Sequence, residues 1–593
     1  MLDYRAPLAD MQFVIKNLIG MESLGSLYGN SEFSEETLEL ILLEAEKFAK
    51  SKLNPINFEG DKEGCRLENG TVLTAKGWKD AYNVFREGGW QGLSVSHEFG
   101  GQGLPKVVSS AVSEMWDSTN MSFALCPLLT AGAIDALEAH ASPELKQLYL
   151  YKLVSGEWTG TMNLTEPQSG SDLSNVKTQA IPESKHYRIT GQKIYITYGD
   201  HDLTDNIVHL VLARLPGAPQ GTHGISLFLV PKMVLDENGK PLKRNDLKCI
   251  SLENKLGIHA SPTAVMQFGD EGGAIGYLIG EENKGLSYMF TMMNNARHAV
   301  GREGLALCEA AYQLAKDYSF NRVQGKVPNS AVSDKIIEHQ DVKRMLLEIK
   351  ATTEAMRALV YYCAHLLDIA EKETEEEKSL LVQRRADFLT PVVKAWCTDN
   401  AQHITSLALQ IHGGMGFIEE TGIAQYVRDA RILTIYEGTN GIQALDLLWR
   451  KTIKDNFEAV DSFIEEMEAF LNNELSQNQF SFLNNSMSLC LGDLKDVLNW
   501  LRENRENREI CNSAATHYLH LFGLVFGAWM IFRSASLIDS KSNTELGATQ
   551  VDQQKVKTAE FYAAQILPNT KSLKHKIIDG SKVVEKIDSR VFL

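Results

Sequence analysis

Hydrophobic positions in about the first 155 residues recur at helical spacing. Ser34 precedes Glu35 and Glu36, which is typical of a helix N-cap followed by an acidic first turn. An apolar stripe follows at Leu38, Leu40, Ile41, Leu43 and Ala45. Proline and glycine are concentrated between Gly88 and Pro105, where we expect a long loop.

The pattern changes to strands after about residue 160. The segment 187–197 alternates in period two around Thr190-Gly191, which predicts two strands joined by a turn. Further strands are predicted at 208–212, 224–230 and 263–268. We expect a β unit over residues 160 to about 280, and the missing βαβ alternation argues against a Rossmann sheet.

Helical spacing returns from about residue 285 and continues to the end of the chain. Ala401, Ile404, Ala408 and Ile411 share one face, and Gly413-Gly414 then end the predicted helix. The charged run 371–378 indicates a solvated loop or helix face. The longest apolar run, 521–532, is shorter than the roughly 20 residues that span a bilayer, so we interpret it as a buried helix.

The elements together predict a mainly α protein with a central β domain. At 593 residues the chain is too long for one hydrophobic core. We expect a helical domain over 1–158, a β domain over 159–282, a helical bundle over 283–453 and an additional helical domain over 454–593.

Net charge, cysteine spacing and the two chain ends argue against several classes of partner, metal site and targeting signal. A net charge of −17 gives no general attraction for phosphate, so nucleic acid is not expected as a partner. The eight cysteines are scattered without a CxxC pair, which favours reduced thiols and no metal site. Asp3, Arg5 and Asp10 stand where a signal peptide needs apolar residues, and the last four residues are not a peroxisomal signal. We therefore expect a cytoplasmic protein, or a mitochondrial-matrix protein if the source is eukaryotic.

Two stretches beside the β domain are candidate binding segments. The loop 164–172 is rich in Gly, Ser and Thr, so its backbone could approach a ring or a phosphate closely, although a surface turn uses the same residues. In 193–197, Tyr195 and Thr197 are two apart on a strand and share one face. An edge strand with a half-buried tyrosine is the alternative.

Two more stretches belong to the helical bundle. The glycines of 410–417 either cap a helix or contact a dinucleotide, but a GxGxxG fingerprint after a strand is missing, which argues against nicotinamide. His412 is expected to be a packed residue. Glu437 follows an apolar, β-like run and precedes Gly438, so it could be a desolvated base. A solvated turn glutamate is the alternative.

In this order and with these gaps, the four stretches resemble the acyl-CoA dehydrogenase family. The strings TEPQSGSD, QIHGGMGF and IYEGTNGIQ match family motifs nearly letter for letter, within a resemblance that covers roughly residues 80 to 450. The segment 292–297 resembles the arginine-bearing helix of the family. The segment 318–326 resembles the one whose arginine meets the FAD of a neighbouring subunit.

The resemblance implies an N-terminal helical domain, a middle β-barrel and a C-terminal four-helix bundle, with FAD between barrel and bundle. The unit beyond 454 resembles the long branch of the family, near 600 residues, which includes very-long-chain enzymes and bacterial 3-methylmercaptopropionyl-CoA dehydrogenases. The opening segment 4–11 is most similar to the latter group. In long members the extra domain covers the tetramer surface, so a homodimer is expected.

The implied reaction is α,β-dehydrogenation of an acyl-CoA thioester to the trans-2-enoyl-CoA, in fatty-acid β-oxidation or related catabolism. Glu437 would be the base, and hydride would leave Cβ for flavin N5. The residues implied to bind FAD are Met162, Leu164, Thr165, Gly170, Ser171, Tyr195, Ile196, Thr197, Arg322, Gln410, Gly413, Gly414 and Thr439. Those implied to bind substrate are Ser171, Asn294, Arg297 and Gly438, with Met121, Ser122, Phe123 and Leu125 at the pocket floor.

Five residues depart from the family pattern. Ala296 stands where some members carry the base, which favours Glu437. Tyr195 replaces the usual tryptophan on the flavin face, and Asn294 replaces an aspartate on the CoA side. After Thr439 this chain has Asn440-Gly441 where short members commonly carry Ser-Gln, which implies one fewer contact with adenine.

Three alternatives follow from the resemblance. Acyl-CoA oxidases share the fold and the glutamate, but the motif spellings fit dehydrogenases better, so an electron-transfer flavoprotein is the expected acceptor. A DNA-binding branch has a basic C-terminal domain, whereas residues 454–593 hold 15 Lys+Arg against 19 Asp+Glu. Some long-chain members dock on membranes, but this chain shows no clearly basic amphipathic helix after residue 455.

Overall fold

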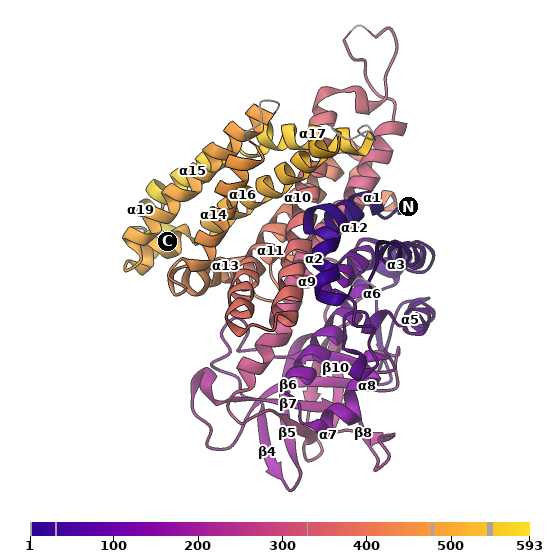
Figure 1. Ribbon diagram of the computed structural model, residues 1–593. Helices are drawn as coiled ribbons and strands as arrows, with labels where there is room; N and C mark the ends of the chain where they lie inside the picture. The colour runs from indigo at the N-terminus through magenta and orange to yellow at the C-terminus, as the bar shows by residue number, and fades with distance from the viewer. Residues whose placement is uncertain (1–2, 30–32, 329, 476–479, 543–549) are drawn as a thin grey trace. The chain divides into compact units, whose positions relative to one another are not determined.

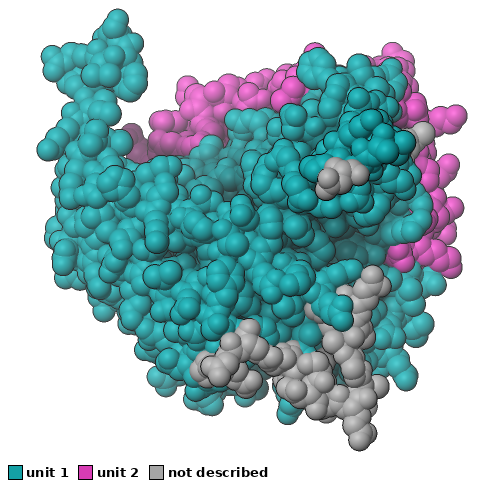
Figure 2. Space-filling model, turned by 90° about the horizontal axis from the view of Figure 1, so that it is seen from above, with its two compact units in different colours: residues 1–44, 105–114, 300–593 teal, residues 45–104, 115–299 magenta. Residues whose placement is uncertain are grey.

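The computed structural model describes residues 3–29, 33–328, 330–475, 480–542 and 550–593. The chain forms two compact units, coloured separately in Figure 2. Unit 1 comprises residues 1–44, 105–114 and 300–593, and unit 2 comprises residues 45–104 and 115–299. The four-domain division at 158, 282 and 453 stays a prediction.

Unit 2 is built around an eight-stranded sheet that curls into a barrel. The strand order is β10-β11-β5-β12-β7-β6-β3, and β4 pairs with both β5 and β6. Neighbours are antiparallel except β3 and β4, which each run parallel to β6. The strands are β3 (Thr159–Asn163), β4 (Gln179–Glu183), β5 (His186–Thr197), β6 (Ile207–Arg214), β7 (Ile225–Pro231), β10 (Leu247–Leu252), β11 (Thr263–Phe268) and β12 (Ala274–Ile279). A separate hairpin joins β8 (Met233–Leu235) to β9 (Pro241–Arg244).

The expected β unit over 160–280 is confirmed, but the turn predicted inside 187–197 is wrong. These residues form the single strand β5, whose first half pairs with β4 and β12 and whose second half pairs with β11. Gly191 lies at the change of partner. A Cβ there would lie 2.5 Å from Thr178 Oγ1. The glycine therefore serves a close approach of two chain segments within a strand, which local patterning does not distinguish from a turn.

The rest of unit 2 is mainly helical, as expected for the N-terminal region. It contains α4 (Asn54–Glu63), α5 (Trp78–Glu87), part of α6 (Lys106–His140), α7 (Pro143–Leu145), α8 (Tyr151–Val154) and the start of α9 (Gly285–Asn321). The hairpin β1 (Arg66–Glu68) to β2 (Thr71–Leu73) was not predicted. Its Asn69-Gly70 turn has both residues at positive φ, which is the common two-residue hairpin signal.

Unit 1 is a set of long helices (Figure 1). The bundle helices are the remainder of α9, α10 (Gln340–Lys372), α11 (Glu376–Ile411) and α12 (Ile423–Leu433). The N-terminal helices are α1 (Leu8–Phe13), α2 (Met21–Tyr28) and α3 (Glu35–Phe48). The C-terminal region contains α13 (Asn440–Leu445), α14 (Glu458–Asn473), α15 (Ser481–Asn504), α16 (Arg508–Ser542), α17 (Gln550–Phe561), α18 (Asn569–His575) and α19 (Ser581–Val584).

Several local predictions are confirmed in these helices. The Ser34 hydroxyl accepts a hydrogen bond from Thr37 N at 3.2 Å, as an N-cap of α3 should. Helix α11 ends at Ile411, just before Gly413 at φ +58. The charged run 371–378 includes the end of α10, the connection and the first residues of α11, and it is largely exposed.

The apolar run 521–532 lies in α16 and is buried, as predicted. By length and composition α6 and α16 could each cross a membrane, but 89% and 78% of their most apolar windows are buried inside the protein. Gly523 of α16 packs on Trp396 of α11, where an added Cβ would lie 2.5 Å from the indole Cγ. The rings of Phe388 and Phe522 meet edge to face at 4.8 Å between centroids. Helix α16 therefore packs closely against the bundle.

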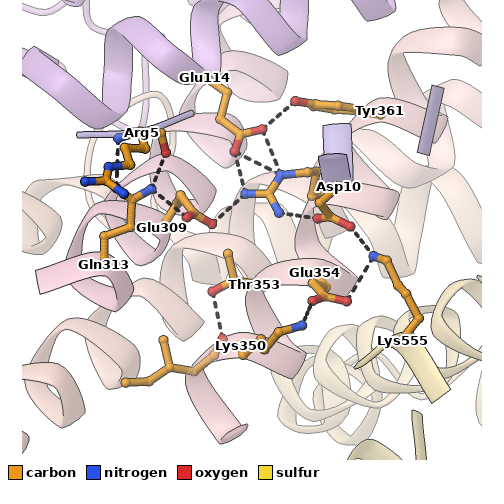
Figure 3. A network of polar contacts seen from close by, with 12 residues as sticks. Arg5, Asp10, Glu114, Glu309, Gln313, Lys350, Thr353, Glu354, Tyr361 and Lys555 are labelled. Atoms are coloured by element: carbon orange, nitrogen blue, oxygen red, sulfur yellow. Dashed lines mark hydrogen bonds and ion pairs between the residues drawn. The ribbon is translucent and has the colours of Figure 1, made fainter. Parts of the chain in front are cut away.

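A buried network of charged side chains joins the segments of unit 1 (Figure 3). Arg357 of α10 is 1% exposed and donates to Glu114 Oε1 at 2.7 Å and to Glu309 Oε2 at 2.8 Å. It also donates to Asp10 of the N-terminal segment. Lys555 of α17 donates to Asp10 and, at 3.0 Å, to Glu354. The network thus links the N-terminal segment, α6, α9, α10 and α17.

The charges in this network depend on one another. Burial alone would raise the pKa of Asp10, but Lys555 and Arg357 hold it well below its ordinary value. Burial raises the pKa of Glu114 despite its contacts with Arg357. Removing the guanidinium would leave carboxylates buried without their counter-charge.

We therefore expect Arg357→Met to destabilise unit 1 strongly. Loss of one partner of a buried ion pair costs about 3–5 kcal/mol, compared with about 1 kcal/mol or less for an exposed pair. Arg384→Met is the matched control, because Arg384 and its partner Glu458 are both about half exposed. Urea unfolding followed by circular dichroism measures both variants, and equal losses of stability would contradict the prediction.

Candidate active site

The candidate base Glu437 lies in a short turn between α12 and α13. The run before it was expected to be β-like, but it belongs to α12 as far as Leu433 and then forms a turn over residues 434–436. The buried residues Ile423, Tyr426, Ala430 and Leu433 are spaced three, four and three apart, so they form one helix face. Consecutive apolar residues near Ile435 obscured this spacing in the sequence.

The turn has a backbone conformation that is unfavourable for glutamate. Glu437 has φ +56 and Gly438 has φ +90, and such strain in a non-glycine residue persists only where its surroundings impose it. Gln443 Nε2 donates to the carbonyl oxygens of both Glu437 and Gly438 at 3.4 Å. Asn440 N donates to Thr434 O at 3.1 Å and closes the turn. Glu437 itself is half-buried.

Side chains on both sides of Glu437 attach the turn to the bundle. The Tyr436 hydroxyl donates to Glu303 of α9, which is fully buried. Asn440 Oδ1 accepts from Lys394 Nζ of α11 at 2.8 Å, and its Nδ2 donates to Asp399 Oδ1, also at 2.8 Å. Sequence reasoning gave these residues no structural role, because their partners lie more than 40 residues away.

The other predicted residues of unit 1 lie at helix ends. Gln410 is in the last turn of α11, and Gly413 and Gly414 follow it. Arg322 is exposed just after α9 ends at Asn321. Thr439 caps α13 by accepting a hydrogen bond from Ile442 N at 3.4 Å.

His412 is a packed residue, as expected. It is 5% exposed, its Nδ1 lies 2.8 Å from Ala408 O, and its ring stacks on Tyr318 with 4.5 Å between centroids. Burial lowers the pKa of the imidazole, which is therefore neutral at physiological pH.

The predicted loop of unit 2 is attached to the barrel by a buried ion pair. Glu166 is 3% exposed and accepts from Lys193 Nζ of β5 at 2.8 Å. It also accepts from Thr178 Oγ1 at 2.6 Å and from Lys177 N at 2.7 Å. Next to it, Thr165 O accepts from Ile194 N at 2.9 Å. The loop that carries Thr165, Gly170 and Ser171 is thus fixed to the strand that carries Tyr195.

The charge of Glu166 is stabilised where it lies. Burial alone would raise its pKa, but Lys193 and the other donors lower the pKa to about 2. The folded pKa of Glu166 lies below the ordinary value of about 4.3, so ionisation of Glu166 contributes stability above that pH, and this contribution is lost as the pH falls toward 2. Burial lowers the pKa of Lys193 to about 8, which opposes part of this gain. The sequence signal was a lysine at a buried position of a strand, which requires a partner.

Strand β5 bulges at the tyrosine. Tyr195 has φ +60 and is 60% exposed, and the register of β5 against β11 shifts between Ala264 and Met266. Ile196 is buried, while Thr197 pairs with Thr263. The segment 193–197 pairs with β11 alone, as the edge-strand alternative expects, but Tyr195 is mostly exposed and not half-buried. Met162 and Leu164 lie on and just after β3.

The predicted substrate residues of unit 2 lie on two helices. On α9, Arg297 is 6% exposed and its Nη1 lies 3.5 Å from Asn294 Oδ1, with Ala296 buried between them in sequence. On α6, the predicted floor residues Met121, Ser122, Phe123 and Leu125 are all buried. Helix α6 breaks at Asn120, whose Oδ1 accepts from Phe123 N at 3.0 Å.

The motif residues have the properties that a flavin cofactor requires. A Cβ added to Gly170, Gly413 or Gly414 would have no atom within 4 Å, so the backbone there is open to a ligand. Two aromatic side chains beside these motifs are exposed, Tyr195 at 60% and Phe417 at 86%. Open backbone amides suit phosphates, and aromatic surface suits a planar ring, so the residues present fit FAD.

Family models match almost the whole chain. They are acyl-CoA dehydrogenase, N-terminal domain (residues 35–157), middle domain (161–270) and C-terminal domain (283–450), followed by acetyl-CoA dehydrogenase C-terminal like (463–588). A 3-methylmercaptopropionyl-CoA dehydrogenase of Ruegeria pomeroyi is 45% identical over 98% of both chains. The chain belongs to the acyl-CoA dehydrogenase family. It is an FAD-dependent oxidoreductase that acts on acyl-CoA.

Other acyl-CoA dehydrogenases are similar over nearly the full length. A butyryl-CoA dehydrogenase of Syntrophomonas wolfei is 33% identical over 95% of both chains. The Caenorhabditis elegans ACDH-11 structure, in complex with C11-CoA, is 22% identical with a TM-score of 0.77, covering 96% of this chain and 95% of its own. The Bacillus anthracis acyl-CoA dehydrogenase complexed with FAD is 21% identical with a TM-score of 0.74, covering 95% and 90%. These structures confirm the predicted helical fold with a central barrel and a further C-terminal domain.

Lys193→Met tests whether the buried ion pair shapes the flavin site of this acyl-CoA dehydrogenase. We expect about tenfold weaker FAD retention, because Glu166 loses a charged hydrogen bond and the attached loop is released. Flavin absorbance per polypeptide after gel filtration measures the effect. Arg188→Met removes an exposed ion pair with Glu183 from the same strand and should retain FAD normally. Full FAD content in Lys193→Met would contradict the prediction.

Proposed function

We propose that Glu437 is the base that removes the Cα proton of the acyl-CoA thioester. The strained turn, attached to the bundle on both sides, is the observation that supports this role, because it fixes the backbone from which the carboxylate extends. Loss of water from around the carboxylate when substrate binds would raise its basicity. Residue 296, where some family members carry the base, is a buried alanine here, so this position supplies no alternative base.

The chain's own groups would stabilise the charge that develops. The Glu437 backbone N–H would donate to the thioester oxygen as enolate character grows, and the fixed turn keeps this donor in place. When bound, FAD supplies the acceptor for the hydride that leaves Cβ. The proton passes to Glu437, so the Cα–H and Cβ–H bonds are replaced by the Cα=Cβ bond of a trans-2-enoyl-CoA.

The binding assignments belong to the same proposal. Thr165, Ser171, Tyr195 and Thr197, with their neighbours Met162, Leu164, Gly170 and Ile196, would contact the flavin side. Arg322, Gln410, Gly413, Gly414 and Thr439 would hold the phosphates and adenine. Ser171, Asn294, Arg297 and Gly438 would contact the CoA thioester. The exposure of Tyr195 and the open glycines support these assignments.

We further propose 3-methylmercaptopropionyl-CoA as the substrate. The relative of that name shares 45% of its residues over 98% of its length, whereas the butyryl-CoA dehydrogenase shares 33%. The residues predicted at the pocket floor, Met121, Ser122, Phe123 and Leu125, include one aromatic ring, which a thioether in the acyl chain would contact favourably.

An electron-transfer flavoprotein is the proposed acceptor, and a homodimer in the cytoplasm is the proposed state. The support for the acceptor is an Acidaminococcus fermentans chain that is 26% identical with a TM-score of 0.58. It covers 70% of this chain and 97% of its own. Its structure concerns the electron-transferring flavoprotein of that organism and flavin-based electron bifurcation. The extra C-terminal helices and the family resemblance support the dimer and the compartment.

Glu437→Gln should keep its FAD and lose at least about 1,000-fold of its dehydrogenation rate, because an amide cannot accept the Cα proton. Glu420→Gln, an exposed glutamate ahead of α12, is the control and should be unaffected. Anaerobic mixing with substrate, followed by bleaching of the visible flavin spectrum, measures both variants. Near-normal bleaching by Glu437→Gln would end the assignment of the base.

A panel of acyl-CoAs tests the substrate. In an anaerobic titration we expect 3-methylmercaptopropionyl-CoA to bleach the flavin at lower concentration than butyryl-CoA, and palmitoyl-CoA to bleach it least, because a pocket matched to a short acyl chain would exclude a long one. Bleaching by the long chain at the lowest concentration would overturn the substrate proposal and leave the reaction type standing.

A further inference from the structure

The C-terminal helix α16 contacts the bundle beside the catalytic turn. His520 of α16 places Nε2 3.0 Å from Asp399 Oδ2 of α11. The other oxygen of the same carboxylate accepts from Asn440 Nδ2 at 2.8 Å. Asn440 is three residues beyond Glu437 and opens α13. An ion-pair contact from His520 to Asp399, followed by a hydrogen bond from Asn440 to the same carboxylate, therefore links α16 through α11 to the turn that carries the base.

The hydrogen bonds of Asn440 fix the orientation of its side-chain amide. Lys394 can only donate, so the Asn440 oxygen must face it, and an ionised Asp399 can only accept, so the Asn440 nitrogen must face Asp399. Nδ2 also lies 2.9 Å from Thr398 Oγ1. The amide of Asn440 thus has one orientation, held between a fully buried lysine and a carboxylate that α16 in turn contacts.

Two more contacts attach the segment after the turn to the same helix. Thr452 Oγ1 lies 3.0 Å from the Tyr518 hydroxyl, and both side chains are buried. Trp449 Nε1 donates to Asn512 Oδ1 at 2.7 Å. Asn512, Tyr518 and His520 all belong to α16, so this helix contacts the chain on the C-terminal side of Glu437 directly at two places and through Asp399 at a third.

We propose that α16 is a positioning element of the active site, acting on Glu437 through His520, Asp399 and Asn440. The inference rests on the proposed role of Glu437 as base. These three are positioning residues, because their contacts end at the turn and do not reach the reacting atoms. The additional C-terminal helices then take part in catalysis by limiting the freedom of the turn.

The physical reason lies in the strain at Glu437. A left-handed glutamate relaxes to a right-handed or extended conformation when its surroundings loosen, and that change moves the carboxylate away from the Cα proton. A displacement on the order of 1 Å lowers a rate by about 100-fold. Loss of one contact in the line should have a smaller effect than this, because Tyr436 still attaches the other side of the turn.

His520→Ala tests the proposal in the full-length holoenzyme. We expect flavin bleaching by saturating substrate to slow by about tenfold, which corresponds to the free energy of one polar contact to a charged group. The dissociation constant for acyl-CoA should not change. His520→Gln keeps an N–H donor toward Asp399 and should recover most of the rate. His575→Ala is the matched control. His575 also pairs with an aspartate, Asp579, but it lies on α18 and is 78% exposed.

Amide hydrogen exchange gives a second readout that does not depend on turnover. In His520→Ala, exchange of the peptide 434–443 should become faster, while the melting temperature stays close to that of His575→Ala. In a double-mutant cycle with Asn440→Ser, the two rate losses should be less than additive, because both changes break the same line. A normal rate and normal exchange in His520→Ala would overturn the proposal.

These outcomes separate the inference from the proposed function. If Glu437→Gln is inactive while His520→Ala is normal, Glu437 remains the base and α16 has no positioning role. If Glu437→Gln retains activity, the proposed base is wrong, whatever His520→Ala does. A rate loss in His520→Ala that His520→Gln does not recover, with unchanged exchange of 434–443, would also refute the hydrogen-bonded route.

Discussion

Unit 1 depends on one buried guanidinium. Arg357 contacts carboxylates from the N-terminal segment, α6 and α9. One of them, Asp10, also accepts a hydrogen bond from Lys555 of α17 (Figure 3). Apolar packing alone would tolerate small shifts among these helices, because it has no direction. A planar donor with several fixed acceptors does not, so the network selects one arrangement of segments that are hundreds of residues apart.

The same device recurs where the chemistry is expected. The Thr165 loop is held by Glu166 and Lys193, and the Glu437 turn is held by Glu303, Lys394 and Asp399. In both places a backbone at positive φ, Tyr195 or Glu437, lies next to the buried contact. Strained backbone persists where surrounding bonds over-determine it, which is how an enzyme fixes reactive groups in advance. The polar core thus prepares both motif regions for ligand binding.

Sequence patterns predicted the features that short stretches determine. The cap at Ser34, the strands β6, β7 and β11, the end of α11 and the motif strings are all encoded within about a dozen residues. The wrong predictions share a different cause. Gly191 serves an approach to Thr178, and the start of the run before Glu437 belongs to α12, whose buried face begins at Ile423, ahead of the motif. The partners of Asn440, for which no prediction was made, come from another helix. None of these determinants lies in the window from which the prediction was made. The Asn69-Gly70 hairpin was the exception, since its signal was local and was overlooked.

The packing of Gly523 on Trp396 has a consequence for how such chains can evolve. The indole is 1% exposed, and the ring of Phe522 next to the glycine meets Phe388 of the same bundle helix. A gene shortened ahead of α16 would bare this aromatic surface on an otherwise finished bundle and produce an aggregation-prone protein. The C-terminal extension is therefore no detachable accessory. Large aromatic residues now occupy the bundle surface that α16 covers. Loss of the extension would therefore require these residues to be replaced by polar ones at the same time, which makes a return to the shorter architecture difficult.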